Sequence, residues 1–253
     1  MYVAPSMEQR AKTLTIYGRK PVLEALSDPA LDATTLHVAD SNKPGGIIGS
    51  IYKLAETRGV RIRQHDRDSL SRISKNKKQD QGVALDISCP HFDPIEKLVA
   101  HAHDRDFRVL ALDGITNPQN VGMIIRSAAA GGVDAIIYPR KGVAALGPLV
   151  IKASVGTVFR APLSFCESLN DGLEQLKDAG FCIASLEGGA RESLFDYRPT
   201  CATVFVLGGE SDGVSPSTST LAGKRLYIPM QRGVESLNVA VAASLIAYAP
   251  NLR

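Results

Sequence analysis

Short apolar stretches alternate with stretches of helical period along most of this chain, and this alternation constrains its fold more than any other feature. FRVLALDG (107–114) and DAIIYP (134–139) are rich in apolar residues, as strands covered on both faces are. VGMIIRSAAAGG (121–132) and LNDGLEQLKDAG (169–180) carry apolar residues at helical spacing and end at glycine. We therefore expect an α/β fold whose mostly parallel sheet has helices on both faces. Further strands are expected at 181–186, 203–210 and 225–229, followed by a closing helix.

The first third of the chain shows the same alternation on a smaller scale. SCPHFDP (88–94) contains two prolines and no periodic pattern, which is typical of a linker. Helices are expected at 17–27 and 46–59, and strands at 35–40, 60–64 and 82–87. We accordingly expect an N-terminal extension (1–15), a small α/β domain (16–88), a linker with a first helix (89–106) and a larger α/β domain (107–253).

Composition excludes several classes of protein. The longest apolar run, 239–249, is interrupted by Ser244 and is shorter than the roughly 20 residues that a membrane-spanning helix needs. The N-terminal segment lacks the apolar core of a secretory signal, although a short organellar leader stays open. The four cysteines are far apart and form no C-x-x-C pair, which argues against a zinc ribbon or a disulfide framework. We expect a cytoplasmic protein with reduced thiols and no metal.

Positive charge is concentrated near the N-terminus. Residues 1–90 hold 14 Lys and Arg against 10 Asp and Glu, and residues 58–78 alone hold eight basic residues and two acids. Such a segment suits a polyanion such as RNA. A solvated basic face is the alternative that charge alone leaves open.

The loop that follows the strand at 107–114 is the first candidate for chemistry, because ligands of parallel sheets bind at the carboxyl ends of strands. Asn117 and Pro118 read as an ordinary helix cap and first helical residue. That reading leaves Asn120 and Arg126 unexplained. Arg126 is expected inside an otherwise apolar helix face, where an arginine needs an anionic partner.

Two later loops share this character. Gly208 and Gly209 end a strongly apolar strand and are followed by Glu210, an acid that a simple tight turn does not require. Ser236 and Asn238 lie together where the last strand leads into the closing helix. A tight turn at the glycines and a helix cap at Ser236 are the structural alternatives.

Other motifs carry little weight. The chain contains neither G-x-G-x-x-G nor a P-loop, so a conventional dinucleotide or nucleotide site is not supported. HAHDRD (101–106) resembles a metal cluster but is better explained as a charged helix end. Ser154 has no nucleophile elbow around it and no later histidine to act as its base.

Taken together, three stretches resemble the successive motifs of the SpoU (TrmH) family of RNA ribose 2′-O-methyltransferases. They are NPQNVGMIIRSAAAGG, FVLGGESDGVS and IPMQRGVESLNVAVAASLIAYA. The resemblance implies a C-terminal trefoil-knot (SPOUT) domain that binds S-adenosylmethionine and works as a homodimer. It also extends over residues 16–88, which resemble the ribosomal-protein-like RNA-binding domain of family members that act on ribosomal RNA.

The resemblance also implies roles for individual residues. Arg126 would contact the RNA phosphate beside the target ribose, as a general base or as an electrostatic stabiliser. The expected catalytic set is Asn120, Arg126, Glu210, Ser236 and Asn238. The expected cofactor set is Leu207, Gly208, Gly209, Ile228, Met230 and Leu237.

The N-terminal domain would hold the RNA. Its expected contacts are basic residues: Arg19, Arg58, Arg61, Arg63, Lys75, Lys77 and Lys78. One departure from the family pattern is Asp80, which stands where related sequences often have histidine. Ribosomal RNA is the favoured substrate, and a tRNA methyltransferase or a non-catalytic RNA-binding protein with this fold are the alternatives.

Overall fold

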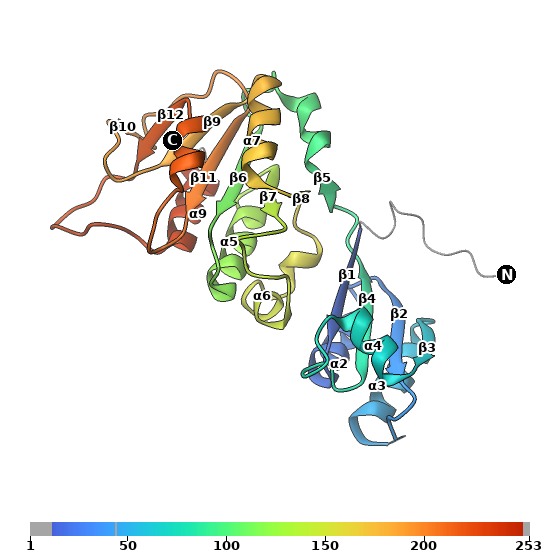
Figure 1. Cartoon of the computed structure of the whole chain (residues 1–253). Coiled ribbons are helices and arrows are strands. Elements are labelled where there is room, and N and C mark those ends of the chain that lie inside the picture. Colours follow the sequence, from blue (N-terminus) through green and yellow to red (C-terminus); the bar gives the residue numbers. More distant parts are fainter. Residues whose placement is uncertain (1–11, 44, 250–253) are drawn as a thin grey trace. The chain divides into compact units, whose positions relative to one another are not determined.

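The computed structural model describes residues 12–43 and 45–249, which form two compact units divided between Pro90 and His91. Figure 1 shows the path of the chain through both units. Residues 1–11 of the expected N-terminal extension and residues 250–253 of the expected larger domain lie outside the described residues.

The N-terminal unit is built on a four-stranded sheet in the order β1-β4-β2-β3. β4 pairs antiparallel with β1 and with β2, whereas β2 and β3 are parallel, so this sheet is mixed. Its strands are β1 (Thr13–Tyr17), β2 (Ala33–Ala39), β3 (Arg61–His65) and β4 (Val83–Ser88). Its helices are α2 (Arg19–Ser27), α3 (Gly46–Thr57) and α4 (Arg67–Ser74).

Strand alternation gives this sheet two different faces. Ile16, Leu36 and Leu85 are fully buried, on the opposite face from their polar neighbours. α4 packs on the other face, where its Leu70 joins Ala39 and Ala84. β1 and α4 were not predicted, because β1 is polar at alternate positions and α4 buries only Leu70 and Ser74.

The C-terminal unit is built on an eight-stranded sheet in the order β10-β12-β9-β11-β6-β7-β8-β5. Every pairing among its described strands is parallel, as the apolar runs predicted. The strands are β5 (Asp93–Pro94), β6 (Arg108–Asp113), β7 (Ala135–Pro139), β8 (Leu163–Cys166), β9 (Cys182–Leu186), β10 (Glu192–Ser193), β11 (Thr203–Gly208) and β12 (Lys224–Tyr227). β5 lies within the segment that was expected to be a linker, and its Pro94 is tolerated because β5 is an edge strand.

Helices cover both faces of this sheet. α7 and the short helix η1 pack on the face that presents Val109, Ala111 and Val204. α5 packs against α6 and α9, and α9 also contacts β11. The bounds are η1 (Ile95–His101), α5 (Pro118–Ala130), α6 (Pro148–Ala153), η2 (Thr157–Phe159), α7 (Leu169–Asp178), α8 (Pro216–Leu221) and α9 (Val239–Tyr248).

Gly122 sets how closely α5 approaches α6. A Cβ atom at this position would lie 2.5 Å from Cβ of Ala153 and 2.7 Å from the carbonyl oxygen of Val150. Any larger residue would therefore push the two helices apart. The glycine keeps the first turns of α5, which carry Asn120, in place against the rest of the unit.

Candidate active site

The first turn of α5 carries the first group of predicted site residues. Asn117 caps the helix by accepting a hydrogen bond from the backbone N–H of Gln119 at 2.9 Å, and Pro118 occupies the first turn, as predicted. Asn120 follows and is buried, with a relative exposure of 3%. A buried carboxamide needs partners for its polar atoms, so the neighbours of Asn120 decide what it does.

Asn238, which is 118 positions later in the chain, supplies that partner. Its Nδ2 donates to Oδ1 of Asn120 at 3.0 Å and to Oε1 of Glu210 at 2.7 Å. Its Oδ1 accepts from the backbone N–H of Ala240 at 2.9 Å, so Asn238 is also the N-cap of α9. One side chain thus joins the first turn of α5 to the loops that follow β11 and β12. Asn238 takes the capping role that the sequence left open for Ser236.

Arg126 and Ser236 are exposed and lie outside this network. Among the described residues, no partner forms a hydrogen bond or ion pair with the side chain of Arg126. The expectation that it lies within an apolar helix face is wrong, because its side chain is on the solvent side of α5 together with that of Met123. The guanidinium is therefore free, within one copy of the described chain, to meet an anion from outside.

The expected cofactor residues lie at the ends of β11 and β12. Leu207 is buried, and Gly208 is the last residue of β11. A Cβ at Gly208 would lie 1.9 Å from the carbonyl carbon of Gly213, so the loop folds back directly over the strand end and only glycine fits there. Ile228 and Met230 are half-buried in the loop after β12, and Leu237 in the same loop is 37% exposed.

The expected RNA-binding residues of the N-terminal unit differ in their surroundings. Arg58 donates from Nη1 to the carbonyl oxygens of Leu26 at 2.8 Å and Asp28 at 2.9 Å, and from Nη2 to that of Leu31. Lys77 forms an ion pair with Asp68 at 2.8 Å. Arg19 and Arg63 are half-buried, whereas Arg61, Lys75 and Lys78 are exposed.

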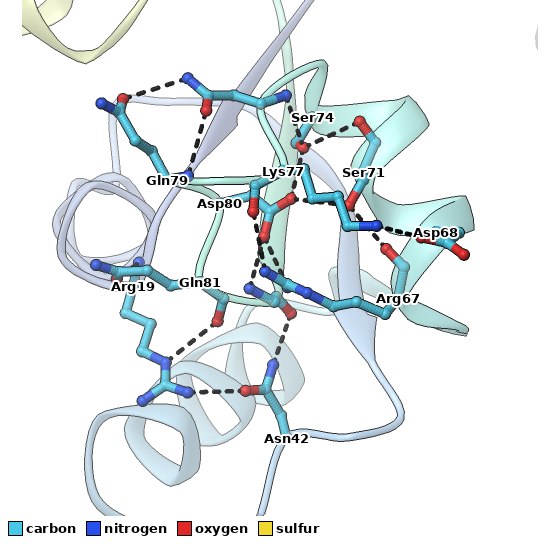
Figure 2. A network of polar contacts seen from close by, with 12 residues as sticks. Arg19, Asn42, Arg67, Asp68, Ser71, Ser74, Lys77, Gln79, Asp80 and Gln81 are labelled. Carbon is cyan, nitrogen blue, oxygen red and sulfur yellow. Dashed lines mark hydrogen bonds and ion pairs between the residues drawn. The ribbon is translucent and has the colours of Figure 1, made fainter.

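Asp80 is fully buried at the centre of a polar network in the N-terminal unit (Figure 2). Its carboxylate pairs with Nη1 of Arg67 at 2.7 Å, and it accepts from Ser74 Oγ at 2.8 Å and from the backbone N–H of Gly82 at 2.9 Å. Sequence reasoning missed Arg67, Asn42 and Gln81 as candidate site residues. The one sequence feature that pointed to this network is the polar turn QDQG (79–82) around Asp80, and four residues are too few to indicate which distant side chains Asp80 contacts.

Within the described residues, no group of histidines, cysteines and acids is arranged to hold a metal ion, and no helix is long and apolar enough to cross a membrane. The four cysteines are free thiols. Burial raises the pKa of the Cys89 thiol to about 12 and that of Cys166 to about 11. These two thiols therefore stay protonated and unreactive at neutral pH.

Two family models together match most of the chain. Residues 107–248 match the SpoU rRNA methylase family, and residues 15–92 match the RNA 2′-O ribose methyltransferase substrate-binding family. These ranges agree with the resemblance that the three motifs indicated.

Individual relatives belong to the same family as the one that the family models indicate. A TrmH family tRNA/rRNA methyltransferase of Staphylococcus saprophyticus is 33% identical over 93% of this chain and 94% of its own length. A tRNA/rRNA methyltransferase of Mycolicibacterium smegmatis is 31% identical over 96% of this chain and 79% of its own.

Solved structures show the same fold. An RNA methyltransferase of the TrmH family from Porphyromonas gingivalis superposes with a TM-score of 0.62 at 23% identity, over 95% of this chain and 90% of its own. The SpoU methyltransferase AviRb of Streptomyces viridochromogenes, in complex with AdoMet, superposes with a TM-score of 0.61 at 24% identity, over 97% and 92%. The parallel sheet, the three joined loops and these matches have one consistent explanation: the chain belongs to the SpoU rRNA methylase family of RNA methyltransferases.

Proposed function

We propose that this protein transfers a methyl group from S-adenosylmethionine to a ribose 2′-hydroxyl of RNA, with ribosomal RNA as the substrate. The observation that carries the proposal is the bridge that Asn238 makes between Asn120 and Glu210. This bridge joins one polar residue from each of the three motifs, namely Asn120, Glu210 and Asn238. A purely structural cap would need only the Oδ1 of Asn238.

The loops after β11 and β12 are the proposed site of S-adenosylmethionine. Gly208 and Gly209 let the backbone at Gly213 and Gly114 pack directly against the end of β11, and Ile228, Met230 and Leu237 offer apolar surface that is not fully buried. Backbone N–H groups and apolar contacts suit the adenosine part of the cofactor. The bound cofactor supplies an electrophilic methyl group, and the protein must orient the ribose toward it.

A ribose hydroxyl is a weak nucleophile until its proton is removed, so the protein must position it and stabilise the charge that develops on its oxygen. We assign charge stabilisation to Arg126, because its guanidinium has no partner among the described residues. It can bind the RNA phosphate beside the target ribose with two parallel hydrogen bonds. Because a guanidinium is a poor proton acceptor, electrostatic stabilisation suits Arg126 better than the role of general base. Asn120 and Asn238 would orient the ribose, Glu210 would hold Asn238, and Ser236 would contact the cofactor or the RNA.

The proposal includes a homodimer. The helices α5 and α9 pack against each other and still expose apolar side chains, which is typical of an interface. In the same unit the exposed apolar side chains of these and neighbouring elements are Met123, Leu149, Val155, Val241 and Tyr248. A second copy would cover them and bring further groups close to Arg126.

Ribosomal RNA is favoured over tRNA because the chain has a separate N-terminal unit that matches a substrate-binding family, in addition to the rRNA methylase match. The relatives are named tRNA/rRNA methyltransferases, so tRNA is the competing substrate.

The decisive experiment incubates the purified protein with tritiated S-adenosylmethionine and either unmodified ribosomal RNA or unmodified tRNA. Label in ribosomal RNA at a position that resists alkaline cleavage supports 2′-O-methylation. Label that stays on a base refutes the ribose assignment, and label in tRNA alone refutes the ribosomal one. Absence of label in both RNAs favours a non-catalytic protein with this fold.

A further inference from the structure

An open polar pocket of about 540 Å³ lies within the N-terminal unit, apart from the candidate active site. Its lining is Arg19, Ser41, Asn42, Arg67 and Gln81. These residues come from the start of α2, the loop after β2, the start of α4 and the turn before β4. Segments far apart in the sequence therefore converge on one concave surface that carries two guanidinium groups.

Arg19 is held in position by the protein (Figure 2). Its Nε donates to the carbonyl oxygen of Gln81 at 3.3 Å, and its Nη2 donates to Oδ1 of Asn42 at 2.9 Å. The backbone N–H of Arg19 is satisfied by Oε1 of Gln81 at 3.0 Å. Nη1 of Arg19 has no bond to a described residue, so this guanidinium is oriented by the protein and still has donors to offer a ligand.

Arg67, at the start of α4, is the second arginine of the pocket and is also held by the protein. Its Nη1 pairs with the buried carboxylate of Asp80, and its Nη2 donates to the carbonyl oxygen of Lys77 at 3.2 Å. Its side chain is 38% exposed, and its Nε has no bond to a described residue. The buried acid therefore orients an arginine that the solvent, or a ligand, can still reach.

The turn between the two arginines adopts an unusual backbone. Gln81 has a positive φ of 51°, which is uncommon for a residue with a side chain. Gly82 follows with a φ of 77°, and a Cβ there would lie 2.5 Å from Nδ2 of Asn42, which donates to the carbonyl oxygen of Gly82. Such conformations persist where the surrounding structure holds them, and they concentrate at functional sites.

We infer that this pocket binds a phosphate group of the substrate RNA through Arg19 and Arg67, with Asp80 as the residue that positions Arg67. The inference rests on the proposed function, which supplies RNA as the ligand. Two oriented guanidiniums beside amide and hydroxyl groups match the oxygens of a phosphodiester. Within the part of the chain that the structure describes, no aromatic side chain lines the pocket on which a base could stack, so the contact is to the backbone and independent of sequence.

The inference separates the basic residues of this unit into two groups. The guanidinium of Arg58 donates to backbone carbonyl oxygens in the last turn of α2 and in the segment that follows it. Arg58 is not part of the pocket. Arg19 is the residue shared by the pocket and by the expectation from sequence. Asp80, the departure from the family pattern, orients Arg67 on the wall of this pocket.

The test measures binding of the full-length protein to a fluorescein-labelled 20-nucleotide polyuridine at several salt concentrations. Arg19→Ala is compared with Lys53→Ala, which removes the same charge from an exposed position on α3 outside the pocket. Loss of one phosphate contact reduces the slope of log K against log salt by about 0.7 for a single strand. We expect Arg19→Ala to show that change and about tenfold weaker binding at low salt, and Lys53→Ala to stay within about twofold of wild type.

Arg67→Lys gives a second readout, because lysine keeps the charge opposite Asp80 but loses the planar fork of donors. We expect a weaker affinity with an unchanged thermal midpoint. Equal affinity and equal salt slope for Arg19→Ala and Lys53→Ala would overturn the inference.

Methyl transfer to ribosomal RNA, measured in parallel, separates the two proposals. Loss of binding in Arg19→Ala from a wild type that transfers no methyl group would leave the pocket and refute the proposed function. An active wild type whose Arg19→Ala variant binds like Lys53→Ala would refute the pocket and leave the function.

Discussion

Asn238 lies 3.0 Å from Asn120, Nδ2 to Oδ1, although 118 positions separate the two residues in the chain. The contact ties the cap of α9 to the first turn of α5 and, through the same Nδ2, to Glu210. Because one carboxamide both caps a helix and joins the three motifs, its structural and functional contributions can be separated by substitution.

Asn238→Ser keeps an oxygen that can cap α9 but removes the amide that reaches Asn120 and Glu210. Both Asn238→Ser and Asn238→Ala leave the buried Oδ1 of Asn120 without its donor, which costs about 1–2 kcal/mol in the free energy of unfolding. Asn238→Ala costs about 1 kcal/mol more than Asn238→Ser, because it also loses the cap of α9. Both variants should lose methyl transfer on the order of 100-fold, because the ribose is no longer oriented. Urea unfolding and methyl-transfer assays measure the two effects. Full activity in Asn238→Ser would show that the bridge is only structural.

Arg126→Ala removes an exposed side chain with no partner among the described residues. Its stability should therefore stay within about 0.5 kcal/mol of wild type. We expect methyl transfer to fall by on the order of 100-fold or more, since the charge on the attacking oxygen loses its stabiliser. Calorimetry should show unchanged binding of S-adenosylmethionine. Arg160→Ala, at another exposed arginine of the same unit, is the matched control, and joint loss of binding and activity would assign Arg126 a structural role.

Arg58→Ala removes hydrogen bonds to the backbone carbonyls of Leu26, Asp28 and Leu31. We expect a loss of about 2 kcal/mol in the free energy of unfolding of the N-terminal unit, because those carbonyls lose charged donors. The affinity of the folded variant for RNA should match that of Lys53→Ala, which removes the same charge from an exposed position on α3. Weaker RNA binding without a stability change would instead place Arg58 in the RNA interface.

Asp80→Ala leaves Ser74 and the backbone N–H of Gly82 without their acceptor and releases Arg67. Unsatisfied buried donors cost about 2 kcal/mol. We expect the free energy of unfolding to fall by that amount, with a correspondingly lower unfolding midpoint. Asp68→Ala is the control, because Asp68 also pairs with a basic side chain but is exposed, and its midpoint should not change. Equal effects of the two substitutions would contradict the central position of Asp80.

His65 should make the stability of the N-terminal unit depend on pH. Burial lowers the pKa of His65, and the positive charges of His37 and Arg63 lower it further, while Asp66 acts in the opposite direction. His37 contacts both His65, at 2.9 Å, and Asp86, at 3.0 Å, which couples His65 to the interior of the sheet.

The unfolded chain, with an ordinary histidine pKa of about 6.5, binds more protons than the folded chain as the pH falls through that value. Stability should therefore decrease as the pH falls below about 6.5 toward the lowered pKa of the folded state. Urea unfolding at about pH 7.5 and 5.5 measures the change. His65→Gln should reduce it, and His91→Gln, at an exposed position, should not. If His65→Gln lost as much stability between these two pH values as the wild type, His65 would not be the cause of the pH dependence.

The sequence predicted the long, strongly apolar elements well, because strands buried on both faces need continuous apolar residues wherever they lie in the sheet. β6, β7, β9 and β11 follow this rule. It did not predict β8 or α4, because a four-residue strand and a helix that buries only Leu70 and Ser74 depend on their neighbours for stability. The three motifs were likewise visible, and the family that they indicated is confirmed by the matches to residues 107–248 and 15–92.

By itself, the sequence determined the fold class, the family and the residue types available for chemistry, since these depend on local pattern and on the identity of short motifs. Only the tertiary structure decided that Asn238, rather than Ser236, caps α9 while bridging Asn120 and Glu210, and that Asp80 orients Arg67 opposite Arg19. The physical reason is that a hydrogen bond depends on atoms being within about 3 Å of each other. Sequence separation carries no information about that distance once the chain has crossed the sheet.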